Sequence, residues 1–210
     1  MLKSVLLTFC LSASAAAVAE QVLVETKGMS LVLSVEQGKH PQYQYFGTRL
    51  KDADLTNLPE RVANGRLDAY PAYGLNAPAE AALAIRHADG NLSTALVATG
   101  VSQESDSSAN ATVTRVKMKD PAYPVTVDLC FRAYQDVDMI ETWTEITSQE
   151  KPQLTLTQFA SIALPIRRGN VWMSQLYGTW ADEGQLVEAP LHEGIRMIKN
   201  KDGVRNSHTA

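Results

Sequence analysis

The chain has 210 residues, with 23 acidic against 19 basic side chains and a formal net charge of −4 at pH 7. Its hydrophobic share of 45% and charged share of 20% are ordinary for a globular protein, so a core of this size needs no disulfide or metal to hold it. The mildly acidic balance argues against nucleic acid or an anionic membrane surface as a partner.

The first 19 residues have the pattern of a secretory signal peptide. Lys3 supplies the positive start, residues 5–11 are an apolar run, and residues 17–19 read Ala-Val-Ala, a small-residue cleavage signal. The apolar run is shorter than the roughly 20 residues that a membrane span needs. We therefore predict cleavage near Ala19, no membrane anchor, and a secreted or periplasmic protein.

From residue 20 onward the chain reads as strand after strand. Residues 22–26 and 30–35 flank a plausible hairpin turn at residues 27–28. A second turn at residues 37–39, with Gly in its centre, leads into a third apolar run at residues 43–50. The pattern predicts three consecutive strands joined by short turns.

The middle of the chain adds a weak helical signal and a second hairpin signal. Residues 52–63 are compatible with a turn or a short helix. Residues 81–87 and 92–101 flank Asp-Gly-Asn at 89–91, which predicts a hairpin because Gly accepts the positive φ that such turns need. Polar loops are expected at residues 103–110 and 148–153.

Alternation of apolar and polar residues dominates the later segments. Val125, Val127, Leu129 and Phe131 alternate with polar or smaller residues, which places one face of a strand on a core. Leu154 and Leu156 alternate with threonines in the same way. Many strands with short turns and without an internal repeat predict an all-β, antiparallel sandwich in a single domain over residues 20–200.

Candidate chemical groups in the chain have simpler explanations. Cys130, the lone cysteine after cleavage, lies in an apolar strand and is expected to be a buried, inert thiol. Acidic pairs exist, at residues 136 and 138 and at residues 141 and 145, but strand-face acids beside Lys and Arg are usually solvated. The four histidines lack the spacing of a metal site, so we expect no bound metal. We also expect no catalytic residue and no cofactor in this chain.

Several segments, taken in order, resemble the N-terminal β-domain of glycoside hydrolase family 36, the α-galactosidases, in their secreted Bacteroides-like form. The segments are residues 70–74 (Tyr-Pro-Ala-Tyr-Gly), 87–91 (His-Ala-Asp-Gly-Asn), 119–121 (Lys-Asp-Pro), 136–146 and 176–183 (Leu-Tyr-Gly-Thr-Trp-Ala-Asp-Glu), then Leu191, Gly194, Gly203 and Ser207-His208. The similarity extends over roughly residues 22–209, nearly the whole chain after the signal peptide.

The resemblance implies a large twisted β-sandwich, or supersandwich, over residues 20–200. Residues 201–210 would begin the linker to a catalytic (β/α)8 barrel. In the family, that barrel carries an Asp nucleophile in a Lys-Trp-Asp motif and a second Asp as general acid, and this sequence has no such motif. The parent enzyme would hydrolyse terminal α-galactosides with retention, while this chain alone is expected to be inactive.

The resemblance also implies roles for this domain in barrel packing, homo-oligomer contacts and lining the sugar pocket. The substrate-proximal candidates are Tyr73, Asn76 and Trp180. Residues 75–78 read Leu-Asn-Ala-Pro and so lack the Asp-x-Arg motif that many family members carry after this turn. Trp172 and Tyr177, with Tyr73 and Trp180, are candidates for an aromatic sugar platform, although Trp172 is expected first in the core or at the joint with the barrel.

Two other readings of the sequence remain open. The first is a stand-alone galactoside-binding module, in which exposed aromatic residues bind sugar without hydrolysis. The second is a secreted β-sandwich scaffold without catalysis. Exposure of Trp180 separates the first of these from a purely structural domain.

Overall fold

The computed structural model describes residues 19–58, 67–74, 80–166, 169–179, 182–192 and 194–198. The chain divides into two compact units, Met1–Pro165 and Ile166–Ala210. This division falls inside the single domain predicted over residues 20–200. The predicted signal peptide, apart from Ala19, and the predicted linker at 201–210 lie outside the described residues.

Three antiparallel strands form the first sheet, in the order β1-β2-β3. Val22 and Val24 of β1 pair with Leu33 and Leu31 of β2, and all four side chains are buried. The predicted strands and turns of this segment are therefore confirmed, and Gly38 has a φ of +78° in the second turn. The elements are β1 (Glu20–Glu25), β2 (Met29–Val35), β3 (Gln42–Thr48) and the short helix α1 (Asp52–Leu55) that follows them.

A second sheet has four antiparallel strands in the order β5-β6-β7-β8. Its strands are β5 (Val97–Asp106), β6 (Ala111–Lys119), β7 (Val125–Tyr134) and β8 (Ile140–Ser148). The predicted alternation in β7 is confirmed, since residues 125, 127, 129, 131 and 133 are buried. The loop predicted at 103–110 is shorter than expected, because residues 103–106 extend β5 and pair with β6.

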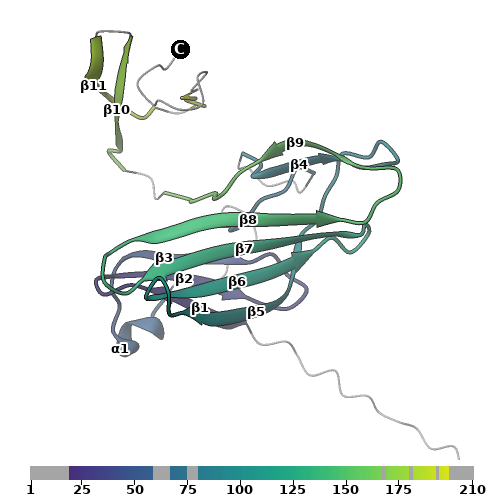
Figure 1. The fold of residues 1–210 in the computed structure, drawn as a ribbon, viewed down its shortest axis with the longest axis horizontal. Helices are drawn as coiled ribbons and strands as arrows, with labels where there is room; N and C mark the ends of the chain where they lie inside the picture. The colour runs from purple at the N-terminus through teal and green to yellow at the C-terminus, as the bar shows by residue number, and fades with distance from the viewer. Residues whose placement is uncertain are drawn as a thin grey trace, which may run out of the picture. The chain divides into compact units, whose positions relative to one another are not determined.

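The core of the first unit lies between these two sheets, which face each other in Figure 1. Val24 and Leu33 from one sheet belong to the same buried cluster as Val116, Leu129 and Phe131 from the other. Each such side chain contributes about 1.5–3 kcal/mol when removed from water. The protein is therefore an all-β antiparallel sandwich, as the strand pattern predicted.

A smaller two-stranded sheet pairs β4 (Leu83–Arg86) with β9 (Thr155–Phe159). This pairing contradicts the hairpin predicted between residues 81–87 and 92–101. The turn itself exists, with Gly90 at a φ of +88°, but residues 91–96 do not form a strand. Their backbone N–H groups donate elsewhere, for example Thr94 to the Tyr73 carbonyl at 3.0 Å, so the chain leaves β4 without pairing to it.

The second unit contains an antiparallel hairpin of β10 (Trp172–Thr179) and β11 (Asp182–Pro190). Trp172 lies opposite Pro190, and Leu176 lies opposite Leu186. Trp172 is 63% exposed, so of the two places expected for it, a core and the joint with the barrel, the described unit does not provide the first.

Among the residues described, no helix has the length and apolar character needed to cross a membrane.

Candidate functional site

Tyr73 lies in a turn between the first sheet and β4, which we call the Tyr73 turn (residues 70–74). Tyr70 and Ala72 are buried, whereas the Tyr73 side chain is 53% exposed. The Tyr73 N–H donates to the Leu83 carbonyl at 2.8 Å, which ties the turn to β4. The turn thus has a fixed base and presents one aromatic ring to solvent. The other two predicted site residues, Asn76 and Trp180, lie outside the described residues.

The Tyr73 turn packs closely against the segment that follows the 88–90 turn. Gly74 has a φ of +100°, and a Cβ placed on it would lie 2.7 Å from the Cα of Ser93. The next residue, Thr94, donates its backbone N–H to the Tyr73 carbonyl at 3.0 Å. Only glycine allows this approach of two backbones, since any side chain at residue 74 would clash.

Beneath this contact is a buried pair, His87 and Glu150. His87 Nδ1 lies 2.7 Å from Glu150 Oε1, and His87 Nε2 lies 3.0 Å from the Thr94 hydroxyl. The second carboxylate oxygen of Glu150 accepts the Ala88 N–H at 2.8 Å. Their side chains are 0% and 4% exposed, so both depend on these partners for the hydrogen bonds that water would otherwise supply.

An aromatic ring and two polar residues complete the cluster on the side of the 88–90 turn. Tyr123 stacks on His87 with ring centroids 3.6 Å apart and an interplanar angle of 12°. Its hydroxyl donates to Asp89 Oδ2 at 2.9 Å and accepts from Asn91 Nδ2 at 2.8 Å. The Asn91 N–H and the Tyr123 hydroxyl hold the pKa of the Asp89 carboxyl below its ordinary value. The cluster therefore fixes residues 87–94 through side chains.

Sequence reasoning found half of this cluster. His87, Asp89 and Asn91 were singled out only as parts of a resembling segment, without a role. Glu150 was missed because it lies in a polar loop 63 residues from its histidine. No local pattern could have paired them.

Three of the four acidic residues considered as catalytic pairs, Asp138, Glu141 and Glu145, have structural partners. Glu141 Oε2 accepts from Arg132 at 2.8 Å, and Glu145 Oε1 lies 3.4 Å from Arg115. Asp138 Oδ1 accepts from the Thr26 hydroxyl at 2.9 Å and from the Gly28 N–H at 2.6 Å. These contacts join strands and turns to one another.

The outward face of the four-stranded sheet also carries an aromatic ring that the sequence did not single out. The guanidinium carbons of Arg115 and Arg132 lie 5.8 Å and 5.3 Å from the ring centroid of Trp143. Its indole N–H donates to Glu145 at 2.9 Å. Trp143 is thus a partner of cations and a carboxylate on its own sheet.

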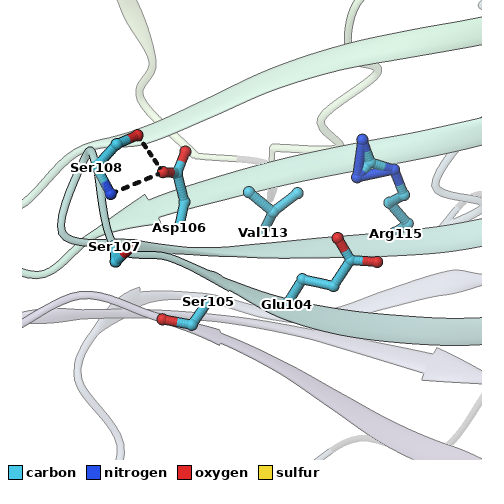
Figure 2. Close-up of a pocket in the computed structure, with 7 residues that line it drawn as sticks. All are labelled: Glu104, Ser105, Asp106, Ser107, Ser108, Val113 and Arg115. Carbon is cyan, nitrogen blue, oxygen red and sulfur yellow. Dashed lines mark hydrogen bonds between the residues drawn. The ribbon is translucent and has the colours of Figure 1, made fainter.

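An open depression of about 290 Å³ lies beside the β5–β6 turn. Figure 2 shows its residues, with Glu104 and Arg115 on neighbouring strands and Asp106 directed back to Ser108. Asp106 Oδ1 accepts from the Ser108 hydroxyl at 2.6 Å and from its N–H at 3.2 Å. These bonds close the turn, and the hydroxyl holds the pKa of the Asp106 carboxyl below its ordinary value.

The described residues contain neither a cluster suited to a metal ion nor an exposed cysteine. Within those residues, no group of three or more His, Cys, Asp or Glu side chains is arranged to hold a metal ion. Cys130 is fully buried and free, as predicted.

Trp172 and Tyr177, two of the aromatic residues predicted for a sugar platform, do not share a face of the hairpin. Trp172 and Tyr177 are five positions apart on β10, and side chains an odd number of positions apart point to opposite faces of a strand. The large apolar residues on the Trp172 face remain uncovered, since Leu176 is 56% and Leu186 is 62% exposed. The hairpin therefore presents an apolar face to solvent.

Comparison with protein families gives one clear result. The model of the glycosyl hydrolase family 36 N-terminal domain matches residues 39–210. A comparison with curated protein sequences gives no match.

Comparison with solved structures finds the same fold in α-galactosidases. AgaA from Geobacillus stearothermophilus matches with a TM-score of 0.76 at 16% identity, over 87% of this chain and 30% of that chain. An α-galactosidase from Lactobacillus brevis matches with a TM-score of 0.70 at 20% identity, over 83% and 28% of the two chains. The galactosidase domain of the α-galactosidase-sucrose kinase AgaSK matches with a TM-score of 0.72 at 19% identity, over 82% and 28%.

At these identities the structural likeness shows the fold, while the family model covers most of the chain. The chain spans less than a third of the length of these solved structures. The chain belongs to glycosyl hydrolase family 36, and its residues 39–210 correspond to the N-terminal domain of that family.

Proposed function

We propose that this chain is the non-catalytic front domain of an exported α-galactosidase. The remainder of the enzyme, a catalytic barrel, would hydrolyse terminal α-galactosides of the raffinose type. Variants of AgaA have been solved with raffinose and with stachyose, which supports this substrate class for the parent enzyme. The predicted signal peptide supports export.

The uncovered hairpin carries this proposal. Two-stranded hairpins are marginal in water, and β10–β11 exposes Trp172, Leu176 and Leu186 on one face. An apolar face of this kind usually marks a surface that another domain covers. We assign that covering surface to the catalytic barrel, because this chain covers only 30% and 28% of the matched enzymes from Geobacillus stearothermophilus and Lactobacillus brevis.

The Tyr73 turn is the part of this domain that we assign to the sugar pocket of the assembled enzyme. Its ring is exposed, and its base is fixed by β4 and Thr94, so it is suited to hold an aromatic face at a constant position. Aromatic rings bind the apolar face of galactose well. The same surface is our candidate for homo-oligomer contacts.

The gene gives a direct test of the proposal. We expect the reading frame to continue beyond the codon for Ala210 into a barrel that contains a Lys-Trp-Asp motif and a second catalytic Asp. A stop codon immediately after Ala210 would contradict the proposal and leave an independent sandwich.

A stand-alone galactoside-binding module is the second candidate, favoured by the exposure of Tyr73 and Trp172. Titration of residues 20–210 with galactose and raffinose, followed by NMR, separates the two. Saturable shifts that disappear in Tyr73→Ala would favour the module. Unchanged spectra at millimolar sugar would favour the domain that needs its barrel.

A further inference from the structure

We propose that Glu150 and His87 are positioning residues for the Tyr73 turn. A relay of contacts runs from the Glu150 carboxylate through the His87 ring to the Thr94 hydroxyl. The backbone N–H of Thr94 in turn donates to the Tyr73 carbonyl. The importance of this turn for sugar binding rests on the proposed function. The relay itself rests on the contacts of the described residues.

The contacts determine where the hydrogens of the relay lie. Both oxygens of Glu150 accept, one from His87 Nδ1 at 2.7 Å and one from the Ala88 N–H at 2.8 Å. His87 Nδ1 therefore carries a hydrogen that it donates to Glu150, and Nε2 lies 3.0 Å from the Thr94 hydroxyl. Each group thus orients the next, and replacing one of them leaves a buried polar atom without a partner.

The relay matters because residues 91–95 have no strand partner to hold them. Side chains fix this segment instead, together with two backbone hydrogen bonds, from the His87 N–H to the Asn91 carbonyl and from the Thr94 N–H to the Tyr73 carbonyl. Asn91 donates to the Tyr123 hydroxyl at 2.8 Å, and Asp120 Oδ2 accepts the Ala95 N–H at 2.8 Å. Thr94, between these two anchors, is the residue that contacts both His87 and the Tyr73 carbonyl. Loosening Thr94 therefore loosens the turn, while the two large sheets are unaffected.

Three substitutions separate the links of the relay. Thr94→Val removes the hydroxyl and keeps nearly the same shape. His87→Asn keeps an amide nitrogen close to the Nδ1 position, facing Glu150, but is too short to reach Thr94. His87→Gln places its amide near the Nε2 position, within reach of Thr94, but loses the bond to Glu150. Thr99→Val is the matched control, because Thr99 donates to the Lys117 carbonyl at 3.2 Å on an exposed part of β5.

Amide hydrogen exchange of residues 20–210, measured by NMR, tests the relay. We expect the Thr94 amide to exchange about tenfold faster in Thr94→Val and His87→Asn, and less than that in His87→Gln. The β6 and β7 amides should keep their protection in all variants, and Thr99→Val should leave Thr94 unchanged. The ¹⁵N shifts of the His87 ring should report a hydrogen on Nδ1 in the unmodified chain.

The proposal is overturned if Thr94 exchange is unchanged in Thr94→Val, or if it rises only together with every strand amide. A ring protonated on Nε2 alone would also overturn it. If the histidine variants fail to fold, Thr94→Val and the ring tautomer still decide the matter. No sugar is present in these measurements, so their outcome is independent of whether the chain belongs to an α-galactosidase.

Discussion

Two buried tyrosines of the sandwich differ in what their hydroxyl groups contact. The Tyr70 hydroxyl donates to the Ala160 carbonyl at 2.9 Å. The Tyr43 hydroxyl has no hydrogen-bond partner among the described residues, and burial raises the pKa of this phenol well above its ordinary value. A buried hydroxyl without a partner costs stability, whereas a bonded one contributes to it.

We therefore expect opposite effects from the same substitution at these two residues. Tyr43→Phe should raise the free energy of unfolding by about 1 kcal/mol, because it removes an unsatisfied group. Tyr70→Phe should lower it by about 1 kcal/mol, because it removes a hydrogen bond. Urea denaturation of both variants provides the measurement, and a clear destabilisation by Tyr43→Phe would show that its hydroxyl is bonded.

Cys130 should be chemically inert in the folded chain. Burial, together with the nearby Glu145 carboxylate, raises the pKa of its thiol to about 12, so the reactive thiolate is scarce at neutral pH. We expect iodoacetamide at pH 8 to leave folded residues 20–210 unlabelled and to alkylate the same chain in guanidinium. Mass spectrometry measures the labelled fraction. Equal labelling rates in the two states would contradict this account.

At the scale of elements, the sequence predicted strands better than it predicted their partners. Period-two alternation was enough to locate β7, because half of its residues contact the core. The partner predicted for β4 was wrong. The Asp-Gly-Asn turn can be recognised from adjacent residues, whereas Leu83 pairs with Phe159, which is distant in the sequence. The same limit applies to the site. The resemblance directed attention to Tyr73, but its anchor at Glu150 depends on a contact between distant segments.

The two glycine turns of this region differ in what surrounds them. Gly74 and Gly90 both have positive φ, but only at Gly74 would a Cβ meet another backbone, 2.7 Å from the Ser93 Cα. Gly90→Ala should cost about 1 kcal/mol for its conformation. Gly74→Ala should cost about 1–2 kcal/mol more, since the Tyr73 turn must move away from Ser93. Thermal denaturation compares the two, and equal losses would mean that the two segments are not in close contact.

At the scale of the whole molecule, the chain pairs a closed core with an uncovered hairpin. The first unit buries its large apolar side chains between two sheets, whereas the second exposes Trp172, Leu176 and Leu186. This contrast fits a domain that is completed by a larger enzyme. The family resemblance predicted an exposed apolar face on this chain. The strand pattern of the sequence could not predict it, because a covered strand and an uncovered one show the same alternation of apolar and polar residues.

The uncovered face should make the isolated chain associate with itself. We expect residues 20–210 to sediment as a concentration-dependent mixture of species. The double variant Leu176→Gln and Leu186→Gln should shift this mixture towards monomer, because it removes two exposed apolar side chains. The paired substitution Tyr177→Gln and Val187→Gln, on the opposite face of the same hairpin, is the control and should leave the association unchanged. A clean monomer of the unmodified chain at high concentration would contradict the need for a covering partner.

An assay of purified residues 20–210 with nitrophenyl α-galactoside tests whether this domain is non-catalytic. We expect no release of nitrophenol above the rate of the buffer, because the glutamates of β8 are paired with arginines. Turnover that follows the protein through purification, and that disappears when it is denatured, would instead place a catalytic site within this sandwich.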